Sequence, residues 1–155
     1  MINENEFENS LICQSKIKEI ITKSSRIIGN VIAYRGIRHE KSDSLIKEDF
    51  LPTIMERNDN EMPSNEVQER KTKIESFGMS LFYDPNIMIN VFNSVPSMRG
   101  KFKAYAVGQL LESKGTIGEP DSTTHFQMYL FDPINLNVVS EFKYYEKEEK
   151  NDETD

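Results

Sequence analysis

The chain has 155 residues, of which 37% are hydrophobic and 29% are charged, and it carries a net charge of −7. This length and composition are typical of one globular domain and exclude a chain that is disordered throughout. The negative charge argues against general binding to a nucleic-acid backbone, which needs a basic surface, and no apolar run approaches the roughly 18 residues of a membrane span.

The N-terminal region predicts a helix over residues 4–28, because apolar residues recur at mostly helical spacing between glutamates and lysines. Gly29 and Asn30 then supply the stop. The acidic start lacks the basic and apolar parts of a secretory signal, and Cys13, the single cysteine, has no partner for an internal disulfide. We therefore expect a cytoplasmic protein in which Cys13 is a packed thiol. The abundance of isoleucine, lysine and asparagine is typical of an AT-rich bacterial or phage genome.

Residues 31–37 form an apolar run that predicts a strand, with one arginine set inside it. A charge between apolar neighbours is costly to bury unless it is paired or lines a cleft. Arg35 is therefore either half of a structural ion pair, with Asp49 or Glu75 as its partner, or a prepared site for an anion. Gly36 beside it would let a ligand approach the backbone.

Residues 38–75 hold little apolar material and predict an excursion from the main sheet, a candidate lid or interaction surface. Pro52 breaks any helix between residues 45 and 57. Residues 58–64 predict a loop, and residues 65–74 predict a short exposed helix.

The second half of the chain predicts strands around one further helix. Asp84 and Pro85 form a strong helix start as N-cap and first helical residue, and Pro96 ends that helix. Gly108, inside a long strand, suggests a bulge or a close backbone approach. Residues 115–122 predict a turn-rich link. The predicted strands are residues 101–111, 125–131 and 138–145, and residues 76–82 predict a strand or a tight strand-like turn.

Together these elements predict an α+β fold with an N-terminal helix, a mostly antiparallel sheet, one further packed helix and a long loop-rich excursion. Residues 1–145 would form a single globular domain. Residues 146–155 contain six acidic residues and two lysines, and we expect an acidic disordered tail there.

Three segments carry the residue types of a ligand cleft. An arginine on a strand can hold a phosphate or carboxylate in a bidentate fork, and serine hydroxyls can orient that arginine or donate to a ribose. A glutamate or glutamine on an opposite strand could accept from ribose hydroxyls. The candidate residues are Tyr34, Arg35 and Gly36; Ser76 and Ser80; and His125, Gln127 and Tyr129, with Glu141 on the neighbouring strand.

Other kinds of site find little support in the sequence. His39 and His125 are far apart in the chain, so we expect no metal site. Neither histidine has a visible serine or cysteine partner of the triad kind, which leaves hydrolase chemistry unsupported. The glycine-rich patterns that cradle phosphates are absent.

A family resemblance rests on the order of these motifs. Tyr-Arg-Gly on a first strand, then Ser-Phe-x-x-Ser, a helix and paired strands resembles the ADP-ribosyltransferase superfamily of arginine–serine–glutamate type, over residues 32–142. The resemblance implies that Arg35 contacts the phosphates of NAD. It also implies that Ser76 and Ser80 brace the pocket of the nicotinamide ribose.

The third motif of that family differs in this chain. In the family, a glutamate in a Gln/Glu-x-Glu pattern polarises the ribose 2′-hydroxyl as nicotinamide leaves. At that place this chain has His125-Phe126-Gln127, with Gln127 where the acid should stand. If the chain transfers ADP-ribose, Glu141 is the best remaining catalytic acid.

Two functions follow as expectations. The first is a small nucleotide- or NAD-binding domain of ADP-ribosyltransferase-like shape, for which binding is better supported than catalysis because the motif's acid is missing. The second is a non-enzymatic protein-interaction module, such as a phage- or mobile-element-encoded inhibitor or a subunit of a bacterial complex. The expected partner is accordingly a nucleotide or another protein.

Overall fold

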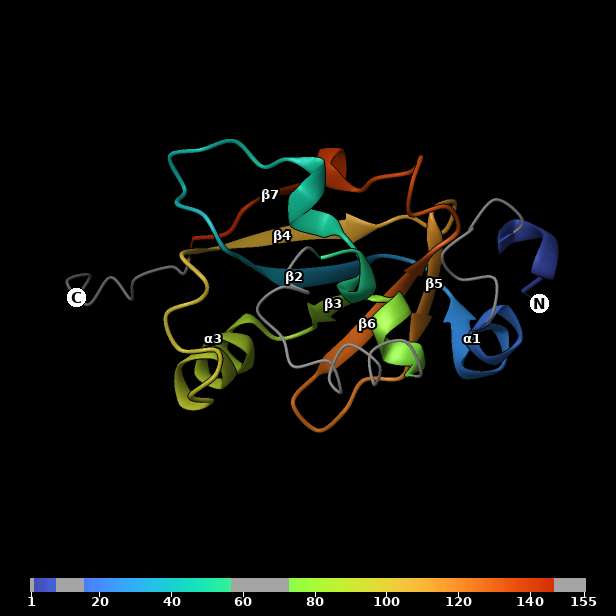
Figure 1. Ribbon diagram of the computed structural model, residues 1–155, viewed down its shortest axis with the longest axis horizontal. Coiled ribbons are helices and arrows are strands. Elements are labelled where there is room, and N and C mark those ends of the chain that lie inside the picture. The colour runs from blue at the N-terminus through green and yellow to red at the C-terminus, as the bar shows by residue number, and fades with distance from the viewer. Residues whose placement is uncertain (1, 8–15, 57–72, 147–155) are drawn as a thin grey trace.

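Seven strands form one antiparallel sheet in the computed structural model, which describes residues 2–7, 16–56 and 73–146 (Figure 1). The strand order is β1-β5-β6-β3-β2-β4-β7, and each neighbouring pair is antiparallel. The predicted α+β fold with a mostly antiparallel sheet is confirmed. The strands are β1 (Ser24–Arg26), β2 (Val31–Ile37), β3 (Met79–Phe82), β4 (Ala104–Leu110), β5 (Gly115–Gly118), β6 (His125–Leu130) and β7 (Phe142–Tyr144).

Helices α1 (Ile17–Lys23) and α3 (Pro85–Ser94) lie toward opposite ends of the molecule (Figure 1). The predicted start of α3 is confirmed, because the Asp84 carboxylate accepts hydrogen bonds from the backbone N–H groups of Asn86 and Ile87. No helix within the described ranges is long and apolar enough to cross a bilayer. Short 3-10 helices lie in the connections: η1 (Glu4–Phe7), η3 (Lys47–Phe50), η4 (Thr53–Met55), η6 (Ile74–Phe77) and η7 (Val139–Glu141).

The two faces of the sheet carry different hydrophobic clusters, because side chains alternate along each strand. On β6, Met128 joins the main core, whereas Tyr129 joins a second cluster with α1 and η6. On β3, Leu81 lies in the main core, whereas Phe82 packs with residues of α3. The central strands are therefore covered on both faces.

The predicted helix over residues 4–28 is confirmed over α1 and is wrong in the other parts of that range that the structure describes. Residues 4–7 form a 3-10 turn, α1 ends at Lys23, and β1 follows at once. Ser24 explains the end of the helix: its hydroxyl donates to the Ile20 carbonyl at 2.6 Å and contacts Thr116 Oγ1 at 2.8 Å. Serine competes with helical hydrogen bonds in this way. Cys13 lies outside the described residues.

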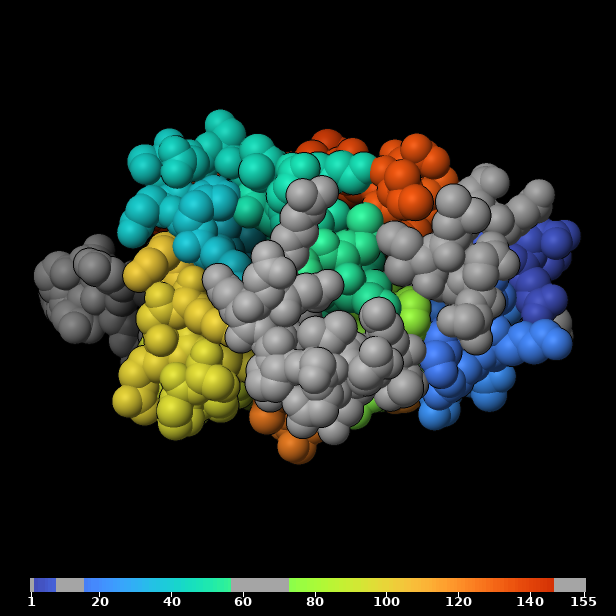
Figure 2. Space-filling model, viewed as in Figure 1, coloured from blue at the N-terminus to red at the C-terminus, as the bar shows by residue number. Residues whose placement is uncertain are grey.

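The segment after β2 contributes more to the core than its composition predicts. Phe50, at the end of η3, is 1% exposed, and its ring centroid lies 4.7 Å from that of Phe142. The backbone N–H of Thr53 donates to the Gly78 carbonyl, so this segment is fastened to the chain just before β3. In Figure 2 its cyan and teal surface runs along one side of the molecule. The expected loop at 58–64 and nearly all of the expected helix at 65–74 lie outside the described residues.

Two further boundaries differ from the prediction. The expected link at residues 115–122 contains β5, whose Gly115 lets it approach β6: a Cβ there would lie 2.3 Å from the Tyr129 carbonyl oxygen. The expected strand at 138–145 begins with η7, and its strand part is the shorter β7. The stretch 76–82, for which the sequence leaves a strand or a tight turn open, has both: the end of η6 and then β3. Beyond Glu146 the expected tail lies outside the described ranges.

We expect Gly108→Ala to destabilise the fold. Its Cβ would lie 2.5 Å from the Glu141 carbonyl oxygen and 2.6 Å from Phe142 Cγ, which confirms the close backbone approach expected at Gly108. Because β7 must shift, the free energy of unfolding in urea should fall by about 1–3 kcal/mol. Gly118→Ala is the control, because its nearest neighbours lie at 3.7 Å or more. Equal losses for the two variants would contradict this account.

Candidate functional site

Three adjacent strands bring the predicted motifs side by side. β6, β3 and β2 are neighbours, and Tyr34, Phe82 and His125 lie in one row across them. Two residues along β3, Ser80 lies directly opposite Gln127. The arginine, serine and glutamine that the sequence singles out therefore belong to neighbouring strands.

The guanidinium of Arg35 is bound to the protein's own backbone. Its Nε donates to the Asp49 carbonyl and its Nη1 to the Ser80 carbonyl, both at 2.7 Å. Its Nη2 is held more loosely, by the Leu51 carbonyl at 3.4 Å and a Glu56 carboxylate oxygen at 3.8 Å. Burial lowers the pKa of Arg35, and Glu56 opposes that shift.

The ladder between β2 and β3 explains this arrangement. Among the described residues, the two strands pair at one position, where Tyr34 faces Phe82. Beyond this pair the two strands, as described, are no longer paired. The Arg35 guanidinium donates to the Ser80 carbonyl instead. The sequence left two interpretations of Arg35, a structural ion pair or an anion site. The structure contains the ion pair, and its partner is Glu56 and not the expected Asp49 or Glu75.

Ser80 and His125 form the polar centre of the site. His125 Nε2 is hydrogen-bonded to Ser80 Oγ, and the Gln127 Nε2 lies 3.4 Å from the same ring nitrogen. His125 Nδ1 lies 3.7 Å from Asp121 Oδ2, an ion-pair distance rather than a hydrogen bond. The imidazole packs against Phe82 with ring centroids 5.0 Å apart, and the side chain stays 29% exposed.

The protonation states of this cluster follow from its surroundings. Burial lowers the pKa of His125, Asp121 opposes that shift, and the Arg35 charge adds to it. Burial acts to raise the pKa of Asp121, but hydrogen bonds from the Thr123 hydroxyl, the Thr123 N–H and the His125 N–H outweigh it, so this pKa is lowered. Near pH 7 the imidazole is therefore neutral and Asp121 is ionised.

The Gln127 side chain carries a buried polar atom. Its Oε1 is buried and has no hydrogen-bond partner within the part of the chain that the structure describes. Gly78 makes room for this side chain, since a Cβ at that position would lie 2.7 Å from the Gln127 Cβ. A buried acceptor left unpaired costs about 1–3 kcal/mol, so it marks a place where a ligand donor would be stabilising.

Glu141 does not join this cluster, and the expectation that it lies on a strand beside β6 is wrong. It ends η7, which leads into β7, and β7 is separated from β6 by three strands, or roughly 19 Å at the usual spacing. Its carboxylate accepts from Lys114 Nζ at 2.6 Å. With Ile32 and Lys143 it lines a shallow hollow of about 280 Å³ at the far edge of the sheet.

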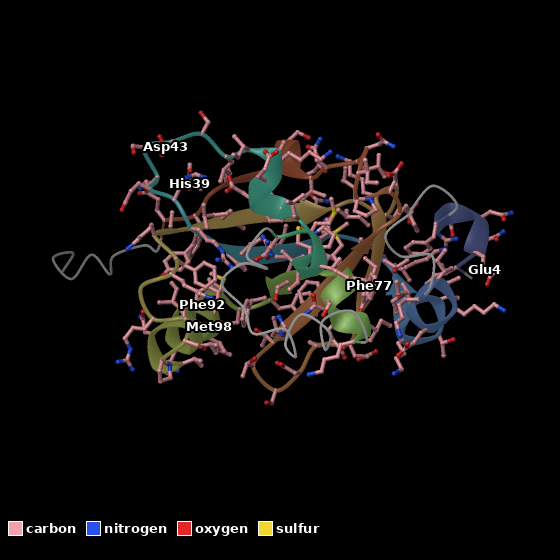
Figure 3. All side chains as sticks on the ribbon, in the orientation of Figure 1. Glu4, His39, Asp43, Phe77, Phe92 and Met98 are labelled. Atoms are coloured by element: carbon pink, nitrogen blue, oxygen red, sulfur yellow. The ribbon has the colours of Figure 1, made fainter. Side chains whose placement is uncertain are left out.

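The remaining predicted site residues are packed into the protein. Tyr34 belongs to the cluster around α3, part of which is labelled at Phe92 and Met98 in Figure 3. Gly36 faces the same cluster, because a Cβ there would meet a ring instead of open space. Ser76 is 7% and Tyr129 3% exposed. These four residues are therefore part of the packed interior.

Asp121 and the contact between Ser80 and His125 were missed by sequence reasoning. Ser80 and His125 are 45 residues apart, so only strand pairing brings them together. Asp121 had a local signal, because an aspartate that accepts from the N–H two residues later makes a turn before the strand. The contact of Glu56 with Arg35 had no such signal.

A second histidine fastens the segment that holds Arg35. His39 Nε2 lies 2.8 Å from Asp49 Oδ2, and His39 Nδ1 lies 2.9 Å from the Glu40 carbonyl. The hydrogen bond with Asp49, followed by that with Glu40, raises the pKa of His39. Figure 3 shows His39 near Asp43, whose carbonyl accepts a hydrogen bond from the Tyr144 hydroxyl of β7. This end of the segment is thus tied to the sheet edge.

Arg35→Ala should destabilise the protein strongly, because it leaves the Asp49 and Ser80 carbonyls without their donor. We expect a loss of about 2–5 kcal/mol in the free energy of unfolding, measured with urea. Arg38→Ala is the matched control: Arg38 also contacts Glu56, at 2.9 Å, but its side chain is 50% exposed. That variant should lose less than about 1 kcal/mol. Similar small losses for both arginines would count against the structural role.

His39→Gln should remove a pH-dependent part of the stability. A raised pKa means that protonated His39 stabilises the fold fully below its unfolded pKa of about 6.5, and that this is lost as pH rises through the folded pKa. The difference in unfolding free energy between wild type and variant should therefore shrink from about pH 5 to about pH 9. For His125→Gln the sign is reversed. Because the pKa of His125 is lowered in the folded state, wild-type protein loses stability relative to this variant as pH falls. A pH-independent difference for His39→Gln would refute the assignment.

Comparisons of this chain with protein-family models, with curated proteins and with solved structures find no match. Within the described ranges there is also no group of three or more residues of metal-ligand type. What bears on function is the geometry of the Ser80, His125 and Gln127 side chains, together with the Arg35 guanidinium and Asp121.

Proposed function

We propose that this chain binds a nucleotide, NAD or a close relative, at the Ser80–His125–Gln127 cluster and has little capacity to transfer ADP-ribose. The observation that carries the proposal is the register of β3 and β6, which sets Ser80 directly opposite Gln127. Arg35 holds the carbonyl of the same serine. In the superfamily that the sequence resembles, the arginine, serine and glutamate motifs together make the NAD pocket, so their convergence here supports a pocket of that kind.

The cluster offers suitable groups to a ribose and a phosphate. The Ser80 hydroxyl and the Gln127 Oε1, which has no partner among the described residues, match the hydroxyl groups of a ribose. The Nη2 of Arg35 has only longer contacts, at 3.4 Å and 3.8 Å, so its N–H groups can also donate to a phosphate oxygen. Glu56 would then keep Arg38 as its partner.

The residue opposite Ser80 limits the chemistry. Gln127 occupies the place where the family's motif has a glutamate, and an amide cannot ionise to polarise the ribose 2′-hydroxyl. Glu141 is several strands away and is paired with Lys114. These two features favour binding over transfer.

NAD or ADP-ribose should raise the melting temperature of the purified protein. A ligand at about one hundred times its dissociation constant adds about 2.7 kcal/mol, which corresponds to several degrees. Ser80→Ala should lose the shift, whereas Ser25→Ala, on the edge strand β1, should keep it. Arg35 is unsuitable for this test because its loss acts on the fold. No shift with NAD, ADP-ribose or common nucleotides would overturn the proposal.

Gln127→Glu restores a carboxylate at the position where the family's motif has a glutamate, and nicotinamide release from NAD is then measured. If the cluster binds NAD as proposed, this variant should release nicotinamide faster than the wild type, because the new carboxylate lies opposite Ser80. Glu141→Gln is the matched control and should change neither binding nor release. A loss of binding on Glu141→Gln would move the site to the other edge of the sheet.

The alternative function, a protein-interaction module, is favoured by two isoleucines near the start of β2. Ile28 is 82% and Ile32 43% exposed, and Ile32 lines the shallow hollow beside β7. Exposed apolar groups of this size are typical of contact surfaces when they cluster. A partner captured by the wild type and lost on Ile32→Asp, with no nucleotide shift, would favour this alternative.

A further inference from the structure

Ser80, His125 and Asp121 form a hydroxyl–imidazole–carboxylate series that nucleotide binding does not require. Ser80 Oγ meets one ring nitrogen, Nε2, and Asp121 Oδ2 lies 3.7 Å from the other, Nδ1. This is the order of groups in which a carboxylate orients an imidazole and the imidazole activates a hydroxyl. The separation at Asp121 is long, and such contacts are often loose before a substrate is bound.

Asp121 is held so that one oxygen faces the imidazole. Its Oδ1 accepts from the Thr123 N–H at 2.8 Å, the Thr123 hydroxyl at 2.6 Å and the His125 N–H at 3.1 Å. The other oxygen, Oδ2, lies 3.7 Å from the ring nitrogen Nδ1 of His125. A carboxylate beside Nδ1 favours the tautomer with the proton on Nδ1, which leaves the lone pair of Nε2 to accept the Ser80 proton.

The imidazole is also in the right charge state to act as a base. Burial lowers the pKa of His125, so it is neutral at pH 7. The charges that act on it are Asp121, which raises this pKa, and Arg35, which lowers it. The Phe82 ring packs against the imidazole, and 29% of the side chain remains exposed to solvent. A reactant can therefore reach it.

We propose that Ser80 is a nucleophile toward activated acyl esters, with His125 as its general base and Asp121 as a positioning residue. Ser80 Oγ bonds to the acyl carbon while its proton passes to His125 Nε2, and the bond to the alcohol breaks as His125 returns that proton to it. Water then attacks the acyl-serine by the same proton route and releases the acid. Gln127 Nε2, 3.4 Å from His125 Nε2, supplies a side-chain donor for the developing oxyanion.

The test is hydrolysis of 4-nitrophenyl acetate by the full chain, followed over many turnovers. Many turnovers are needed because surface lysines react with this ester only once. Ser80→Ala and His125→Gln should each lower the turnover rate by about 100-fold or more, to the level of buffer. Ser25→Ala, on the edge strand, should retain the wild-type rate. Melting temperatures of the variants check that they are folded.

A readout on the wild-type protein keeps the proposal independent of variant folding, and a pH profile tests the role of Asp121. Wild-type protein treated with a fluorophosphonate should gain one adduct, which mass spectrometry of peptides should place on Ser80. Asp121→Asn should lower the rate and move the acid limb of the pH profile to lower pH, because the lost carboxylate had raised the pKa of His125. An acid limb that stays in place would show that Asp121 does not act on the imidazole.

The opposite results would overturn the proposal. They are turnover that survives Ser80→Ala, an adduct on a residue other than Ser80, or no turnover and no adduct in folded wild-type protein. Nucleotide binding is read separately, by melting temperature. Ester turnover without a nucleotide shift, or the reverse, therefore shows which of the two proposals has failed.

Discussion

Two hydrogen bonds of 2.7 Å from the Arg35 guanidinium join β2 to the Ser80 carbonyl of β3 and to the Asp49 carbonyl after η3. Moving a guanidinium out of water is costly, and here carbonyl oxygens and Glu56 offset that cost. Arg35 donates its hydrogen bond to β3 at the point where the backbone pairing between β2 and β3 ends. The backbone of Ser80 is thereby held from one side, while its hydroxyl meets His125.

The segment that accepts from Arg35 is itself held at several points. Asp49 uses its carbonyl for Arg35 and its carboxylate for His39, so the two bonds fix one residue from opposite sides. Phe50 next to it is buried against Phe142 in the main core. The polar segment after β2 is therefore packed firmly against the sheet, because Asp49 and Phe50 within it contact residues of the strands.

The chemistry of the cluster depends on three side chains whose protonation differs. His125 is neutral because burial penalises its charge, whereas Asp121 stays ionised because three hydrogen bonds favour its charge. Gln127 brings a buried oxygen that has no partner among the described residues. Both proposals use Ser80, as a hydrogen-bonding group toward a ribose or as a nucleophile toward an ester, and they differ in whether Asp121 matters.

The sequence by itself determined the local elements: the cap and start of α3, the strand around Arg35, and the alternation in β6. It also singled out Arg35, because a charge in an apolar run is unusual. Tertiary structure alone decided which strands are neighbours, and therefore that Ser80 meets His125 whereas Glu141 lies at the far edge. The physical reason is that a period of two residues predicts a strand but not its partner, and strand pairing joins residues far apart in the chain.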